Sequence, residues 1–381
     1  MTESSKLDKA VFALVRHGMK KKNVVDIEAS TELKKGYYNQ FFLPDCVCAD
    51  GNPANMFLWE GNGKDLIISF CGGGVVTSLE DCKYPISLKS LLTNQIMTYA
   101  ANGLDLFYFA NFFLTKNLGI LSPTEENPFA DWSKVFIPYV GGDFHVGTRD
   151  FPYMDINGNE QTFHSNGYKN FLVAMKYIKD RWPNPERILI TGCSAGSFGA
   201  SALAGKIIDM YPDCENITVY CDSSYLKCDR WKDIAENFWG APEEITSNIH
   251  TDDLGGDWLE ALCRNYGDRA KVLYSCSTKD GVLARFTELI NTGNYEVRVN
   301  RKWFKVVRDG FQDRIKRFEK EELKISYYVN EMGDPLSGGT AHCISQDKKW
   351  AGSKVKKVSP AQWVMDAVNG NTYDVGMDLL K

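Results

Sequence analysis

The sequence predicts an α/β fold built on a mostly parallel β-sheet. Apolar segments of strand length alternate with segments of helical periodicity over most of the 381 residues. A G-x-S-x-G pentapeptide, residues 192–196, stands between a predicted strand and a predicted helix, and other glycines gather in short runs. Strands joined through helices form parallel sheets, so we expect helices to flank the sheet on both faces.

The expected elements alternate along the chain. Strands are expected over 53–60, 65–70, 134–140, 187–191, 216–221, 271–276 and 324–329. Helices are expected over 7–20, over 168–181, from the segment 192–200 to about residue 211, over 301–322 and over 360–369.

Two glycine-containing turns predict hairpins. Gly61-Asn62-Gly63 separates the strands 53–60 and 65–70, and Asn157-Gly158 separates 153–156 from 160–164. No repeat, low-complexity tract or Pro/Ser-rich linker divides the chain. We therefore expect one domain over 1–381, with an N-terminal helical extension over 1–35 and an insertion or cap near 223–265.

Charge and hydropathy exclude some classes of protein. With 44 Lys and Arg against 49 Asp and Glu, the net charge is −5, which disfavours a nucleic-acid binder. The most apolar stretch, 104–114, is too short to cross a bilayer and contains Asp105 and Asn111. No export signal is recognisable at the N-terminus, so a cytoplasmic location is expected if the chain is full length.

The cysteines do not predict a metal site. Their number, eleven, is odd, so at least one thiol is free or pairs between chains. Neither Cys46-Val47-Cys48 nor the series Cys214, Cys221, Cys228 has the paired C-x-x-C spacing of a zinc site. We expect most of these thiols to be buried as small hydrophobic groups, and no metal to be bound.

The pentapeptide Gly192-Cys193-Ser194-Ala195-Gly196 predicts a nucleophilic serine. Its strand-to-helix setting is the one in which this motif presents a serine hydroxyl on a tight turn. Glycines two residues to either side allow the sharp bend. The following helix N-terminus supplies backbone N–H groups and a positive dipole end for a developing oxyanion.

The order of residues along the chain predicts the base and the acid. In folds of this kind the nucleophile is followed by the acid and then by the histidine. Of the five histidines, His342 lies in a glycine-rich loop directly after the strand 324–329. Asp280 and Asp222 both follow strands. We favour Asp280 because it stands one strand before the His342 loop, which leaves Asp222 structural or close enough to the pocket to shape it.

A second glycine run predicts an oxyanion hole. Gly72, Gly73 and Gly74 follow the strand 65–70, where side chains would block an acyl oxygen. Backbone N–H groups of Gly73 or Gly74 would then act with that of Ala195. The run lacks both phosphate-loop patterns, G-x-x-x-x-G-K-[ST] and G-x-G-x-x-G.

Seven stretches of the sequence resemble the pectin acetylesterases and the related Notum-type carboxylesterases. They are CADGNPANMFL (48–58), CGGGVVTSLEDC (71–82), NPFADWSKVFIPYVGGDFHVG (127–147), GCSAGSFGA, VYCDSSY, STKDGVLARF and GTAHC, in the same order as in the family. The resemblance spans about residues 45–345. It implies an α/β-hydrolase-like fold and ester hydrolysis, with Ser194, Asp280 and His342 as the triad.

The sequence also departs from this family. Val75-Val76 follows the glycine run where the family usually has Trp-Cys, which affects the acyl pocket and removes a cysteine that could form a disulfide. Family members are mostly secreted and disulfide-bonded. Asp143 and His145 lie in a segment that, by resemblance, runs near the catalytic mouth, where they would either bind substrate hydroxyls or satisfy loop amides.

The expected function is a serine esterase that needs no metal or organic cofactor. The resemblance implies removal of acetyl groups from a carbohydrate through an acyl-enzyme, so the expected partner is a small-molecule or carbohydrate ester. A carboxylesterase acting on lipid or aryl esters is the alternative. A non-catalytic hydrolase-fold binding protein is disfavoured, because all three triad residue types are present in order.

Overall fold

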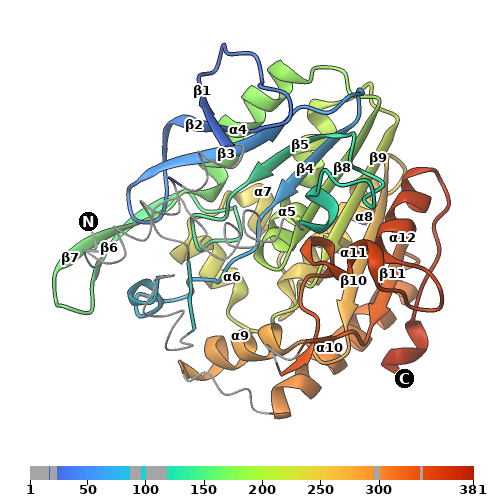
Figure 1. Cartoon of the computed structure of the whole chain (residues 1–381). Coiled ribbons are helices and arrows are strands. Elements are labelled where there is room, and N and C mark those ends of the chain that lie inside the picture. Colours follow the sequence, from blue (N-terminus) through green and yellow to red (C-terminus); the bar gives the residue numbers. More distant parts are fainter. Residues whose placement is uncertain (1–16, 18–23, 86–95, 100–117, 296–300, 335–337) are drawn as a thin grey trace.

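The computed structural model describes residues 17, 24–85, 96–99, 118–295, 301–334 and 338–381. Within these residues, nine strands form a central sheet (Figure 1). In their order across the sheet the strands are β1 (Val24–Ile27), β2 (Tyr38–Val47), β3 (Pro53–Trp59), β5 (Ser133–Ile137), β4 (Leu66–Phe70), β8 (Arg187–Cys193), β9 (Asn216–Asp222), β10 (Ala270–Ser277) and β11 (Ile325–Asn330). From β5 to β11 every neighbouring pair is parallel, whereas β3 runs antiparallel to both β2 and β5. The expected α/β architecture with a mostly parallel sheet is confirmed.

Helices connect the strands. The longer ones are α4 (Gly167–Arg181), α5 (Ala195–Met210), α8 (Leu254–Tyr266), α9 (Gly281–Thr292), α10 (Arg301–Lys320) and α12 (Pro360–Val368). Short helical segments are η1 (Asp81–Lys83), η3 (Gly119–Leu121), α6 (Trp231–Asp233), η4 (Ile234–Phe238), α7 (Glu243–Thr246), η5 (Ile344–Gln346), α11 (Lys349–Gly352) and η6 (Met377–Leu380). Two small sheets pair β6 (Arg149–Met154) with β7 (Glu160–Ser165) and β12 (Gly333–Asp334) with β13 (Gly339–Thr340).

Helices cover both faces of the sheet, as neighbouring residues of β9 illustrate. The ring of Tyr220 meets Trp350 of α11 and Trp363 of α12, at centroid distances of 6.0 and 5.8 Å. The next residue, Cys221, interacts with Ser197 of α5. Successive residues of a strand point to opposite faces, so α5 and α12 lie on opposite sides of the sheet (Figure 1). All the residues of β4 and β5 are buried, as a sheet covered on both faces requires.

The hairpin expected around Gly61-Asn62-Gly63 is wrong. Strands β3 and β4 form where they were expected, but β5 lies between them and pairs with both. The turn instead crosses the start of β5, where the N–H of Gly61 donates to Ser133 Oγ (3.1 Å) and that of Asn62 to the Asp131 carbonyl (2.9 Å). Strand β5, which begins 74 residues after the end of β3 at Trp59, thus occupies the position beside β3 that the local turn signal assigned to β4. The Asn157-Gly158 hairpin, by contrast, is confirmed as β6–β7.

The N-terminal part also differs from expectation. Within the segment 1–35, expected to be a helical extension, residues 24–27 form strand β1, which pairs in parallel with β2 at the edge of the sheet. Val24, Val25 and Ile27 are β-branched and favour a strand. The helix expected over 7–20 and the apolar stretch 104–114 lie largely or wholly outside the described residues.

The segment 223–265, expected as an insertion or cap, contains α6, η4, α7 and most of α8. It packs onto the body through α5, which α8 contacts along its length, and through the buried side chains of Trp231, Trp239 and Trp258. Because these indoles belong to the same core cluster as the sheet strands, we propose that the segment forms part of one domain.

Candidate active site

The predicted catalytic residues follow strands that end at one edge of the sheet. Strands β4, β8, β9, β10 and β11 are mutually parallel, so their carboxyl ends meet there. The loops that follow them carry the glycine run, Ser194, Asp280 and His342, and Asp222 is the last residue of β9. This is the edge at which open α/β sheets place their ligand sites.

Ser194 occupies a strained turn between β8 and α5. Its backbone has φ 53° and ψ −125°, a conformation that residues with a Cβ rarely adopt. A Cβ on Gly192 would lie 2.0 Å from the Gly196 carbonyl oxygen, and one on Gly196 would lie 2.1 Å from that of Phe70. Both glycines of the pentapeptide are therefore required by close backbone approach. The Ser194 side chain makes no hydrogen bond to any described residue.

His342 and Asp280 are in direct contact. The Asp280 Oδ2 atom lies 2.7 Å from His342 Nδ1, and its Oδ1 accepts hydrogen bonds from the N–H groups of Val282 (3.0 Å) and Leu283 (2.9 Å). Asp280 is thus the N-cap of α9 as well as the partner of the imidazole. The Asp280 side chain is fully buried, and that of His342 is 13% exposed.

The surroundings of His342 favour its protonated form. Burial opposes a charge on the ring, but the carboxylates of Asp280 and Asp222, with the thiol of Cys193, outweigh that effect and raise the pKa of His342 above its ordinary value. A histidine that gains affinity for a proton in this way is suited to take one from a serine hydroxyl.

Within the described part of the chain, backbone N–H groups without an acceptor occur in both segments predicted to form an oxyanion hole. Ala195 is the first residue of α5, and N–H groups in the first turn of a helix have no partner within it. Among the described residues, the N–H groups of Gly73 and Gly74 have no acceptor either. The space where Cβ atoms would stand is occupied by the ring of Tyr139 at Gly73 and by the backbone of Met97 and Thr98 at Gly74.

Asp143 and His145 hold the loop that follows β5. Asp143 is fully buried and accepts hydrogen bonds from the N–H groups of Gly167 (2.8 Å) and His145 (3.1 Å) and from Ser165 Oγ (3.1 Å). The His145 Nε2 atom lies 3.0 Å from the Cys71 carbonyl oxygen, at the start of the glycine run. These contacts are of the loop-stabilising kind, which was one of the two roles that the sequence left open.

Burial lowers the pKa of His145 to about 4, so the ring is neutral at pH 7. The Cys71 carbonyl oxygen can only accept, so Nε2 carries the ring's single hydrogen in this state. His145 therefore fixes the first residue of the glycine loop by a hydrogen bond that does not depend on charge.

Asp222 forms hydrogen bonds with β10, with the histidine loop and with the serine turn. Its carboxylate accepts from Ser275 Oγ (2.6 Å) and Ser223 Oγ (3.0 Å) through Oδ1, and from the Ser345 N–H (2.8 Å) through Oδ2. Its carbonyl oxygen accepts from the Ser194 N–H (2.8 Å). Sequence reasoning did not single out Ser223 or Ser345, whose only signal was their place beside Asp222 and His342 in the chain.

The cysteines all lie in the described part of the chain. Ten are buried, and Cys343, next to His342, is partly exposed. The described residues contain no group of three or more His, Cys, Asp or Glu side chains arranged to hold a metal ion. Within the same residues, no helix has the length and apolar character needed to cross a membrane.

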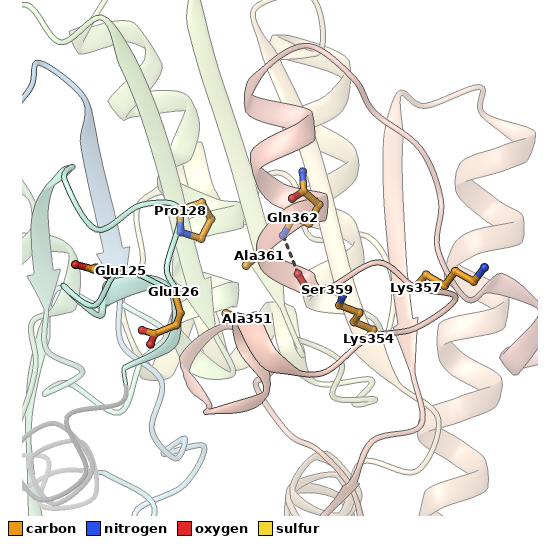
Figure 2. Close-up of a pocket in the computed structure, with 9 residues that line it drawn as sticks. All are labelled: Glu125, Glu126, Pro128, Ala351, Lys354, Lys357, Ser359, Ala361 and Gln362. Atoms are coloured by element: carbon orange, nitrogen blue, oxygen red, sulfur yellow. Dashed lines mark hydrogen bonds between the residues drawn. The ribbon is translucent and has the colours of Figure 1, made fainter.

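A separate hollow of about 430 Å³ lies between the segment 125–128 and the region of α11 and α12 (Figure 2). Glu125 and Glu126 stand on one side of it, and Lys354 and Lys357 on the other. The Ser359 hydroxyl on its rim caps α12 by accepting from the Gln362 N–H (3.2 Å). None of the predicted catalytic residues lines this hollow.

Comparisons with known proteins agree with the motif resemblance. Residues 38–227 match the pectinacetylesterase family. The chain is similar in structure to the Wnt deacylase Notum from Drosophila, with a TM-score of 0.58 and 16% sequence identity over 88% of this chain and 94% of that one. A search of curated proteins gives no match. The family resemblance and the α/β-hydrolase-like fold inferred from the sequence are confirmed.

Proposed function

We propose that this chain, which over residues 38–227 belongs to the pectinacetylesterase family, hydrolyses carboxylic esters through a catalytic triad. Ser194 is the nucleophile, His342 is the base, and Asp280 is the carboxylate that orients His342. Family membership makes the chain a carboxylic-ester hydrolase. The observation that carries the residue assignment is the 2.7 Å contact between Asp280 and His342 at the sheet edge where Ser194 occupies its strained turn.

The reaction proceeds in two acyl-transfer steps. His342 takes the proton of the Ser194 hydroxyl as the oxygen attacks the ester carbonyl, and Asp280 holds the imidazole and stabilises its positive charge. The imidazolium then gives that proton to the departing alcohol, which leaves an ester between Ser194 and the acyl group. Water, activated by His342, hydrolyses this ester and releases the carboxylic acid.

The oxyanion of each tetrahedral intermediate is bound by backbone N–H groups of Ala195 and of Gly73 or Gly74. A well-placed donor of this kind lowers the barrier by about 3 kcal/mol. His145 supports this arrangement, because its hydrogen bond to the Cys71 carbonyl oxygen fixes the residue at which the glycine loop begins.

For the substrate we propose an acetyl ester of a carbohydrate. The family description supports this choice. The competing substrate class is a lipid or aryl ester. Two observations favour it: the structural neighbour reported above is described as a deacylase, and two buried apolar residues, Val75 and Val76, follow the glycine run where the family usually has Trp-Cys. The net charge of −5 offers no general attraction for an anionic polysaccharide.

A series of p-nitrophenyl esters of increasing acyl length tests both levels of the proposal. Wild type should hydrolyse the acetyl ester best, and the Ser194→Ala variant should lose turnover with every member. A preference for long acyl chains would move the assignment to lipid esters. Undiminished turnover by folded Ser194→Ala protein would refute Ser194 as the nucleophile, and release of acetate from acetylated pectin would identify the polymer directly.

A further inference from the structure

The loop that carries His342 is fixed on both sides of the histidine. On its N-terminal side, Thr340 forms a β-bridge with Asp280, the Thr340 N–H donates to the Lys279 carbonyl (2.9 Å), and the Lys279 N–H donates to Thr340 Oγ1 (2.8 Å). These bonds join the histidine loop to the segment that carries the proposed acid. They fix the loop relative to the end of β10, but they do not connect it to the serine.

On the C-terminal side, the loop is bonded to the end of β9. The Ser345 N–H donates to Asp222 Oδ2 (2.8 Å), and the Cys343 N–H donates to Ser223 Oγ (3.2 Å). The Ser223 hydroxyl in turn donates to Asp222 Oδ1 (3.0 Å). Both of these bonds lead to the Asp222 carboxylate. The histidine loop has one further contact with the serine segment, a hydrogen bond between the side chains of Cys343 and Cys193.

The same residue also contacts the serine turn. Asp222 is paired with Cys193 in the β8–β9 register, and its carbonyl oxygen accepts from the Ser194 N–H (2.8 Å). A third bond, from Ser275 Oγ to Oδ1 (2.6 Å), ties the carboxylate to β10. The Asp222 side chain has these three donors within a fully buried site, so its position is over-determined.

We infer that Asp222 is a positioning residue, which sets the distance between His342 and Ser194 by bonding the serine turn through its backbone and the histidine loop through its carboxylate. This inference rests on the proposed function, since it assigns Asp222 a role in the reaction of Ser194 and His342. Asp222 does not take the place of Asp280, whose Oδ2 is the oxygen in contact with the imidazole.

Asp222 acts on His342 by charge as well as by geometry. The titratable groups whose effects reach His342 are Asp280 after β10, Asp222 at the end of β9 and Cys193 at the end of β8, with Cys343 next to it in its own loop. The negative charge of Asp222 contributes to the raised pKa of His342. Removal of that charge should therefore move the acidic limb of the activity profile to lower pH.

The test compares Asp222→Asn, Ser223→Ala and Asp257→Asn with wild type on p-nitrophenyl acetate. Asp257 is the control: it is a buried carboxylate that accepts from the N–H groups of His250 and Thr251 and is paired with Arg317, and it lies outside the proposed catalytic residues. We expect Asp222→Asn to lower kcat about 10²-fold with an unchanged KM, because a displacement of about 1 Å at the reacting groups has an effect of that size. Its acidic limb should shift to lower pH.

Ser223→Ala removes one of the two links and keeps the carboxylate. It should lower kcat by less than Asp222→Asn does, and its acidic limb should stay at the wild-type pH. Asp257→Asn should keep the wild-type kcat and limb. If Asp222 has a purely structural role, Asp222→Asn should have a lower thermal stability, but its kcat per folded molecule and its acidic limb should match those of wild type. That result would overturn the inference.

Two further outcomes keep this test decisive. If Asp222→Asn does not fold, Ser223→Ala decides alone, and a wild-type kcat in that variant counts against the inference. If Ser194→Ala retains full activity, the proposed function itself is wrong, whereas failure of the Asp222 inference alone leaves Ser194→Ala inactive. The two failures are therefore distinguishable.

Discussion

Asp280 and His342 lie 62 residues apart in the chain, yet Oδ2 of the one and Nδ1 of the other are 2.7 Å apart. The contact is held by the β-bridge between Asp280 and Thr340 and by the two N–H groups of α9 that fix the other carboxylate oxygen. The orientation of the aspartate is thus fixed by backbone groups, independently of its contact with the imidazole. Such an arrangement fixes both the tautomer and the direction of the ring.

The first prediction concerns this carboxylate. Asp280→Asn should lower kcat by about 10⁴, because an amide in this place favours the wrong tautomer of His342. The asparagine oxygen can still cap α9, so circular dichroism and thermal unfolding should show a folded protein. Steady-state kinetics with p-nitrophenyl acetate provide the measurement. A loss no larger than that of Asp222→Asn would argue against Asp280 as the acid.

Most of the parallel sheet could be predicted from the sequence, because its strands are short apolar runs separated by helical periodicity. The strand–Ser194–helix arrangement was readable for the same reason, since the pattern and its setting are local. The pairing of β3 could not be predicted correctly, because a glycine turn indicates where the chain bends but does not determine which strand will pair with β3. Strand β5 comes from far along the chain to occupy that place.

The site was predictable in its residue types and only partly in its connections. Chain order placed His342 after Asp280, but no sequence pattern showed that Asp222 would receive bonds from Ser275 and Ser345. These bonds join residues that are 53 and 123 positions apart. Their partners are defined only when the strand ends converge, and one of the donors is a backbone N–H that any residue type would supply.

The second prediction concerns pH. The pKa of His342 is raised, and only the neutral ring can act as the base, so activity should fall as the pH drops through a value above about 6.5, the ordinary pKa of histidine. The acidic limb of kcat/KM between pH 5 and 9 measures this in the free enzyme. A limb at or below the ordinary value would contradict the electrostatic description of the site.

The third prediction concerns His145 and acid stability. Its pKa is lowered to about 4 by burial, whereas the unfolded chain should titrate near 6.5, so the unfolded state binds the extra proton between these values. This histidine therefore destabilises the fold as the pH falls from about 6.5 to 4, by about 3 kcal/mol at the lower end.

His145→Gln removes the titrating group and keeps a side-chain N–H for the Cys71 carbonyl. Urea unfolding of both proteins at pH 7 and pH 5 measures the effect, and the variant should lose less stability between the two. An equal loss in both proteins would show that His145 does not titrate as its burial requires.

The fourth prediction concerns a buried ion pair that contains none of the proposed catalytic residues. Arg314 of α10 is bonded through Nε (2.7 Å) and Nη2 to the carboxylate of Asp253, the N-cap of α8. Arg314→Leu leaves that carboxylate without its closest cation and should lower stability by about 3–5 kcal/mol. Denaturant unfolding provides the number. Arg314 Nη2 also donates to the Ser224 carbonyl (2.8 Å), next to Ser223. The kcat per folded molecule should stay near the wild-type level, and a large fall in kcat at full folding would show that this bond carries the effect of the ion pair to the Ser223 segment.

The central claim is that Ser194 forms a covalent bond to the acyl group, and labelling with a fluorophosphonate followed by peptide mass spectrometry tests it most directly. The reagent should add to the peptide that contains Ser194, once per chain, and p-nitrophenyl turnover should fall in step with labelling. His342→Ala should react far more slowly, because the serine then has no base. Full inhibition with the label on another residue, or full activity after quantitative labelling of Ser194, would contradict the account.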